Sequence, residues 1–238
     1  MTTPVTTRMT TIDWTSIATA LDAEGWAIIP QLLSADECDA VAAAYAGADD
    51  GFRKRVVMAR HGYGRGEYRY FAYPLPPLVQ SLRESLYAPL APIANRWHER
   101  LRLETRFPPT HAEFIARCHA AGQARPTPLL LAYGPGDYNR LHQDLYGEHV
   151  FPLQVVTLLS EPGRAFTGGE LVLTEQRARM QSRAMVVPLG KGDAVVFAVN
   201  SRPQLGTRGE HRVALRHGVS QIRTGSRHTL GIIFHDAE

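Results

Sequence analysis

Two residues with metal-binding side chains stand two positions apart near the middle of the chain. They are His142 and Asp144, at the end of a stretch that begins at Tyr133. Because successive side chains of a β-strand point to opposite faces, residues two apart lie on the same face. A histidine and a carboxylate on one face supply two of the three ligands of a 2-His-1-carboxylate site for non-haem Fe(II). The spacing therefore predicts an iron site that a second histidine would complete.

The third ligand is predicted at His217, near the end of a strand expected over residues 211–217. His211 shares the same face of that strand, but six residues of strand separate the two histidines by roughly 20 Å, so only one can reach the metal. His217 is favoured because it stands beside Gly218 at the strand end, where a side chain reaches the mouth of a barrel. His211 is expected at the surface or at the edge of the core. The same structural role is expected for two further isolated histidines, His149 and His235.

The first 125 residues predict mainly helices with one or two strands. Ser34 and Glu37 have the spacing of a capping box, in which each side chain bonds to the other residue's backbone N–H at the start of a helix. Helices are expected over residues 12–24, 34–46 and 110–120, with two further helical patterns in 77–105 and a strand over 26–30. This half is expected to act as a helical support.

Beyond residue 125 the pattern changes to short apolar runs separated by turns rich in glycine and proline. Eight strands are expected, over residues 128–133, 138–144, 152–159, 169–173, 184–188, 193–198, 211–217 and 228–235. Eight short strands at this spacing predict a jelly roll or barrel rather than a parallel α/β sheet. No repeat or linker divides the 238 residues. We therefore expect one α+β domain over 1–238, with a mainly β core over 126–238.

The composition is that of an ordinary globular protein, with 44% hydrophobic and 21% charged residues and a net charge of +3. This small positive charge permits an acidic partner without requiring one. The two cysteines, Cys38 and Cys118, lack a metal-binding or redox spacing, so both are expected to be buried thiols in a reducing compartment. No run approaches the ~18 apolar residues of a membrane span, and no signal-peptide pattern opens the chain. These features predict a cytoplasmic protein.

Positive charge and aromatic side chains are combined in residues 51–73. The basic residues are Arg53, Lys54, Arg55, Arg60, Arg65 and Arg69, and the aromatic residues are Phe52, Tyr63, Tyr68, Tyr70, Phe71 and Tyr73. Basic side chains bind phosphates and aromatic rings stack on bases, so one interpretation is a lid that faces nucleic acid. The other is a solvated basic face whose tyrosines pack under the barrel.

The candidate ligands resemble the active-site motif of the Fe(II)/2-oxoglutarate-dependent oxygenases. His142-x-Asp144, His217 and Arg227 look like the metal triad and the co-substrate arginine of that superfamily. The resemblance covers about residues 125–236. It implies a double-stranded β-helix, which is a form of jelly roll, and it implies Fe(II), 2-oxoglutarate and O2 as cofactors.

Two branches of the superfamily share further motifs with this chain. Tyr133-x-Pro135-Gly136 is similar to AlkB-type nucleic-acid demethylases, in which the matching tyrosine contacts 2-oxoglutarate. The glycine-containing segments at 168–170, 192–197 and 217–227 look more like prolyl-4-hydroxylases. The whole chain also resembles a bacterial family labelled as oxygenases acting on damaged DNA.

The resemblance implies that two neutral imidazoles and a carboxylate bind one face of Fe(II), while Arg227 holds the distal carboxylate of 2-oxoglutarate. The implied reaction is hydroxylation of a substrate C–H bond with release of succinate and CO2. One alternative is the same chemistry on alkylated DNA or RNA bases. AlkB-type enzymes carry a second arginine six residues after the first, where this chain has Ile233. The other alternative is a non-enzymatic, cupin-like binding protein.

Overall fold

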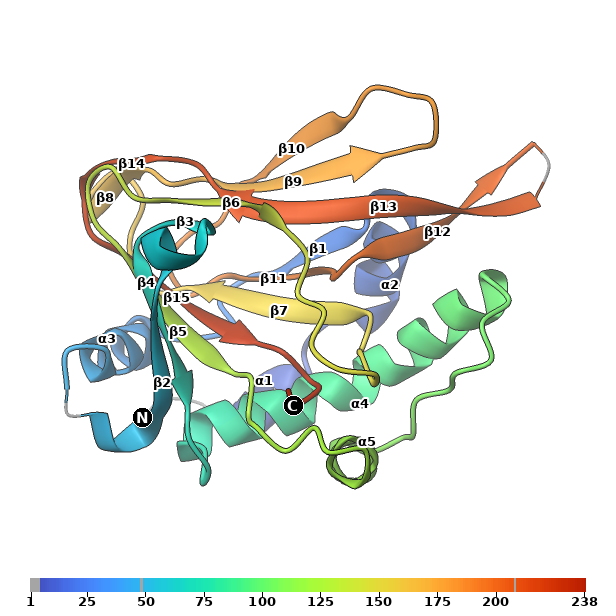
Figure 1. Cartoon of the computed structure of the whole chain (residues 1–238), viewed down its shortest axis with the longest axis horizontal. Helices are drawn as coiled ribbons and strands as arrows, with labels where there is room; N and C mark the ends of the chain where they lie inside the picture. The colour runs from blue at the N-terminus through green and yellow to red at the C-terminus, as the bar shows by residue number, and fades with distance from the viewer. Residues whose placement is uncertain (1–4, 48, 208) are drawn as a thin grey trace.

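Two antiparallel β-sheets face each other in the computed structural model, which describes residues 5–47, 49–207 and 209–238 (Figure 1). The larger sheet has seven strands in the spatial order β1 (Trp26–Ile29), β11 (Ala194–Ala198), β7 (Leu153–Leu158), β15 (Arg227–Ile232), β5 (Leu129–Tyr133), β4 (Glu67–Phe71) and β2 (Phe52–Val57). This arrangement of facing sheets is the jelly roll that the strand spacing predicts.

The second sheet has six strands. Five lie in the order β10 (Arg183–Val187), β9 (Leu171–Gln176), β13 (Gly209–Val219), β6 (Tyr138–His142) and β3 (Gly64–Arg65). The sixth, β12 (Ser201–Gly206), forms a hairpin with the first half of β13. A separate two-stranded sheet joins β14 (Ile222–Gly225) to β8 (Phe166–Gly168).

Most of the helices lie below the seven-stranded sheet, on the side away from the six-stranded sheet (Figure 1). They are α1 (Val5–Met9), α2 (Trp14–Glu24), α3 (Ala35–Ala44), α4 (Pro77–Arg100) and α5 (His111–Ala120). The predicted capping box at the start of α3 is confirmed, with Ser34 and Glu37 each bonded to the other's backbone. The largest apolar cluster joins leucines of α4 to β7, β11 and β15. The helical support and the β core therefore share one buried interface.

Residues 77–105 contain one helix, α4, rather than the two helical segments that were expected. α4 continues through Pro89 and Pro92, although each proline removes one backbone hydrogen bond and usually kinks or ends a helix. Its buried face includes Leu86, Leu90 and Trp97, which pack against the sheet. Burial of this continuous apolar face outweighs the free-energy cost of the prolines within the helix. A local sequence pattern does not include this tertiary packing, so it gives the prolines too much weight.

Each of the eight strands expected beyond residue 125 is present, but three more strands were not predicted. They are β8, β12 and β14. β12 contains Pro203, and a proline argues against a central strand. β8 and β14 have three and four residues, too short to show an alternating pattern.

The first half contains four strands rather than one or two, because residues 51–73 form β2, β3 and β4. The β2–β4 hairpin extends the seven-stranded sheet, while β3 pairs with β6 in the other sheet. Alternation in this segment is hidden by its many charged residues.

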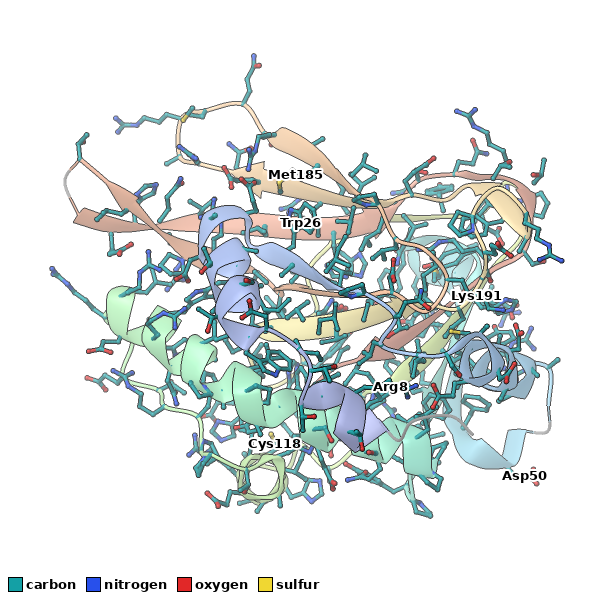
Figure 2. The ribbon with its side chains drawn as sticks, turned by 180° about the vertical axis from the view of Figure 1, so that it is seen from behind. Arg8, Trp26, Asp50, Cys118, Met185 and Lys191 are labelled. Atoms are coloured by element: carbon teal, nitrogen blue, oxygen red, sulfur yellow. The ribbon has the colours of Figure 1, made fainter. Side chains whose placement is uncertain are left out.

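Both cysteines are buried free thiols, as predicted. Cys118 lies on the helical side of the molecule, and Trp26 and Met185 lie on the opposite side, near the six-stranded sheet (Figure 2). Burial raises the pKa of the Cys38 thiol to about 11, so this thiol stays protonated. Among the described helices, none combines the length and the apolar composition that crossing a membrane requires.

Candidate active site

The three predicted metal ligands come together between the two sheets. His142 is the last residue of β6 and pairs directly with His217 on the neighbouring strand β13. Nε2 of His142 lies 3.6 Å from Oδ1 of Asp144, and Nε2 of His217 lies 3.3 Å from Oδ2 of Asp144. One ligand atom from each residue lies within 4.8 Å of the others. This is the donor set and the compactness that a facial triad requires.

Asp144 lies two residues beyond the end of β6, so the expected strand over 138–144 is two residues too long. The side-chain amide of Gln143 donates to the backbone carbonyls of Asn200 and Leu215, at 3.0 and 2.7 Å. These bonds hold Gln143 against the neighbouring strand, and Asp144 consequently faces His217. The side-chain hydrogen bonds of Gln143, rather than strand pairing, therefore position the Asp144 carboxylate.

Gly218 permits the close approach of β13 to β6 at the site. A Cβ at this position would lie 2.7 Å from the carbonyl oxygen of Asn139, closer than real Cβ contacts. The strand pairing changes register between His217 and Val219, directly at this glycine. β13 continues to Val219, so the strand end predicted at residue 217 was too early. Gly218 instead allows a bulge that lies next to the third ligand.

The pKa values of His142 and Asp144 are both below their usual values. Nδ1–H of His142 donates to the carbonyl oxygen of Arg140 at 2.7 Å, which leaves the lone pair on Nε2 facing the cluster. Burial, followed by the nearby charge of His217, lowers the pKa of His142. Burial opposes ionisation of Asp144, but a hydrogen bond from His217 and the charges of both histidines outweigh it and hold its pKa well below the usual value.

Arg227 is a buried cation that forms no salt bridge with the residues that the structure describes. It is 2% exposed, opens β15 and pairs with Tyr133 on β5. Its Nε and Nη1 atoms have no hydrogen-bond partner within the described chain. Burial lowers its pKa to about 10, so the guanidinium stays charged at neutral pH. An unpaired buried charge is costly, so this position suits a ligand that brings a negative charge, such as a carboxylate.

One cavity of about 390 Å³ connects the triad with Arg227 and Tyr133. Most of its remaining wall is apolar and comes from both sheets, including Leu129, Leu131, Leu171, Val219 and Ile233. Tyr63 and Leu141, which are 50% and 44% exposed, also line it. The three candidate metal ligands and Arg227 thus line one cavity whose remaining wall is mostly apolar.

The other predicted positions are distributed as follows. Tyr133 is buried, its ring centre lies 5.6 Å from the Arg227 guanidinium, and its hydroxyl accepts a hydrogen bond from Asn139 at 3.4 Å. His211 is exposed, as expected. His235 is fully buried and accepts the Phe151 backbone N–H, whereas the backbone N–H of His149 donates to Gln123. None of these three histidines joins the ligand cluster of the described residues.

The sequence analysis missed two side chains that contact Asp144. The Tyr146 hydroxyl donates to Oδ1 at 2.7 Å, and the Gln154 amide donates to Oδ2 at 3.0 Å. A signal for Gln154 was present, because it is the one amide in β7, whose other residues are Leu, Val and Thr. Nothing in the spacing marked Tyr146.

The fold is that of a class of proteins that includes 2-oxoglutarate- and Fe(II)-dependent oxygenases. A Pseudomonas putida prolyl-4-hydroxylase has a similar structure, with a TM-score of 0.52 and 16% identity over 94% of this chain and 99% of that chain. A Trichoplax adhaerens prolyl hydroxylase in complex with a hypoxia-inducible-factor peptide fragment gives a TM-score of 0.55 and 14% identity, covering 97% and 91% of the two chains. At such low identity, these similarities confirm the double-stranded β-helix fold.

Sequence comparison identifies the family within that class. The model of the Oxygenase-NA family, described as "Oxygenase, catalysing oxidative methylation of damaged DNA", matches residues 66–237. The uncharacterized Mycobacterium tuberculosis protein Rv2227 is 46% identical over 190 residues, which is 78% of this chain and 82% of that protein. The chain belongs to the Oxygenase-NA family and is therefore an oxidoreductase. Membership of an oxygenase family decides against a non-enzymatic, cupin-like binding protein.

Proposed function

We propose that this protein is a dioxygenase in which His142, Asp144 and His217 bind Fe(II), and that it hydroxylates a C–H bond with release of succinate and CO2. The observation that carries the proposal is the approach of three ligand atoms to within 4.8 Å in the same cavity as an unpaired buried arginine. Residues 1–238 would act as one catalytic domain. Anaerobic addition of Fe(II) and 2-oxoglutarate, with the charge-transfer absorption as readout, tests this proposal.

Each residue of the site has a defined part in this function. The triad would hold Fe(II), which with 2-oxoglutarate and O2 supplies the oxidising power for C–H hydroxylation. Arg227 would hold the distal carboxylate of 2-oxoglutarate through N–H groups that are unpaired within the described chain, and Tyr133 would contact the same co-substrate. The apolar cavity wall would exclude water from the reacting groups. We also propose a cytoplasmic location, which two free buried thiols support.

The substrate of the principal proposal is a small molecule, an amino acid or a protein side chain. The second candidate is an alkylated base in DNA or RNA, which the family description and the tip of the β2–β4 hairpin favour. Tyr63 of this tip lies at the cavity, half exposed, and its ring stacks with His61 at 5.4 Å. The tip carries the exposed arginines Arg60 and Arg65. The backbone N–H of Arg140 donates to the Tyr63 carbonyl oxygen at 2.9 Å, so a third exposed arginine lies next to the tip.

Three arginines of the basic segment outside the tip are engaged in contacts within the protein, whereas Lys54 is exposed. Arg53 lies over the Tyr70 ring at 4.4 Å, and Arg69 lies over the Tyr45 ring at 4.8 Å. Arg55 forms an ion pair with Glu67. Only the tip around residues 58–65 is therefore placed to meet a nucleic acid at the cavity.

Neutralising the arginines of the tip is expected to weaken binding of single-stranded DNA. In the variant Arg60→Gln/Arg65→Gln/Arg140→Gln, the slope of log affinity against log salt concentration should fall by about 2, because each lost phosphate contact removes about 0.7. Fluorescence anisotropy at several salt concentrations measures both quantities. The control is Arg102→Gln/Arg179→Gln/Arg212→Gln, which removes the same number of exposed positive charges away from the tip. The β12–β13 hairpin and the end of α4 lie at the end of the molecule opposite β3 (Figure 1).

Two results would separate the candidates. Salt-dependent binding that only the tip variant loses supports nucleic acid as the substrate. Absent binding, or binding that salt does not affect, contradicts it and leaves the principal proposal in place.

A further inference from the structure

Asp144 accepts a hydrogen bond at each of its carboxylate oxygens, and the two donors come from different elements. Tyr146, in the loop after β6, donates to Oδ1 at 2.7 Å, and Gln154 of β7 donates to Oδ2 at 3.0 Å. Asp144 is buried, so water does not compete freely for these oxygens. Because the two donors occupy different oxygens, neither can replace the other in fixing the plane of the carboxylate.

Gln154 is placed unusually for an amide. It is 2% exposed and belongs to the central strand β7, whose other residues are Leu, Val and Thr. Its Oε1 atom has no hydrogen-bond partner among the described residues. Burial of an unsatisfied amide oxygen costs about 1–3 kcal/mol, so packing alone would favour an apolar residue here. The contacts of Nε2 must therefore explain the amide.

The Nε2 group of Gln154 lies beside two of the proposed metal ligands. It donates to Oδ2 of Asp144 and lies 3.2 Å from Nε2 of His217. Those two ligand atoms are 3.3 Å apart, and the hydrogen bond goes to the carboxylate, because the single lone pair of a neutral imidazole nitrogen is needed for the metal. A carboxylate oxygen has two lone pairs and a glutamine nitrogen has two N–H groups, so Asp144 can accept this bond and still offer a lone pair to a metal.

We propose that Gln154 is a positioning residue that fixes the orientation of the Asp144 carboxylate for metal binding. The inference rests on the proposed role of the triad as the metal site. Hydrogen bonds to ligating side chains orient those side chains, and their loss typically weakens metal binding about 10–100-fold. Gln154 is not one of the proposed metal ligands, so its effect on metal binding passes through Asp144.

The test is binding of Co(II), an oxygen-stable probe of an Fe(II) site, to the whole chain. Gln154→Met keeps the length of the side chain and removes the donor. Its dissociation constant for Co(II) should rise about 10–100-fold, and its visible ligand-field spectrum should differ in position or intensity from that of the wild type. Thr157→Val is the matched control, because it changes a buried polar residue of β7 that points to the opposite face. This control should match the wild type in both measurements.

His217→Ala is measured beside them, so that failure of the metal site and failure of the inference remain distinct. Wild-type affinity that does not exceed that of His217→Ala would contradict the proposed function. Wild-type affinity and spectrum in Gln154→Met, with His217→Ala impaired, would overturn the role of Gln154 alone. Should Gln154→Met not fold by circular dichroism, Gln154→Leu is measured in its place with the same expected loss.

Discussion

Replacement of His217 by alanine is expected to lower 2-oxoglutarate turnover at least about 1000-fold. The change removes one of three proposed ligands, and loss of a metal that supplies about 4 kcal/mol or more of barrier lowering corresponds to that factor. His217 lines the cavity, so the smaller side chain enlarges a space that is already present and the fold should persist. Succinate formation measures the activity, and circular dichroism and urea unfolding check the fold.

His211 provides the matched control on the same strand. His211→Ala removes an imidazole from the same face of β13, but from an exposed position outside the ligand cluster. Its turnover should equal that of the wild type. Activity that survives in His217→Ala, or is lost in His211→Ala, would show that the third ligand was wrongly assigned.

Arg227→Met is expected to raise the KM for 2-oxoglutarate about 100-fold and to leave metal affinity nearly unchanged. Removal of one partner of a buried charge pair costs about 2–5 kcal/mol, which spans this factor. Arg227→Lys should fall between methionine and the wild type, because lysine keeps the charge but lacks the planar guanidinium. Steady-state kinetics with varied 2-oxoglutarate, and Co(II) titration, measure the two quantities.

The same substitution should stabilise the ligand-free protein. Methionine replaces a buried guanidinium whose Nε and Nη1 have no hydrogen-bond partner among the described residues, so the free energy of unfolding should rise by about 1–3 kcal/mol. Arg223→Met, at an exposed arginine four residues earlier, should change neither KM nor stability. An unchanged KM in Arg227→Met would contradict the co-substrate assignment, and a lower stability would mean that this arginine supports the fold.

Sequence spacing carried most of the information about the candidate site. His142 and Asp144 stand two positions apart, and strand geometry allowed only one of the two histidines in the strand expected over residues 211–217 to join them. The position of Asp144 just outside β6 was not predictable, because it depends on the contact of Gln143 with residues more than 50 positions away. Long-range contacts of this kind leave no mark in a local pattern.

The same limit explains the errors in the fold. The register that places His142 opposite His217 is a tertiary property, as is the packing that keeps α4 continuous through Pro89. Residues 51–73 were ambiguous because charge and aromatic content describe both a packed hairpin and a binding surface. The structure divides them: Tyr70 is buried in a core cluster, whereas Tyr63 remains half exposed at the cavity.

The most direct test of the account is anaerobic addition of Fe(II), and then 2-oxoglutarate, to the purified protein while the visible absorption is recorded. Chelation of both by one site produces a metal-to-ligand charge-transfer band that neither Fe(II) nor 2-oxoglutarate produces alone. The account predicts this band in the wild type, its absence in His217→Ala and a weaker band at equal 2-oxoglutarate in Arg227→Met. No band in the wild type, with iron bound no more tightly than by His142→Ala, would contradict the proposed metal site.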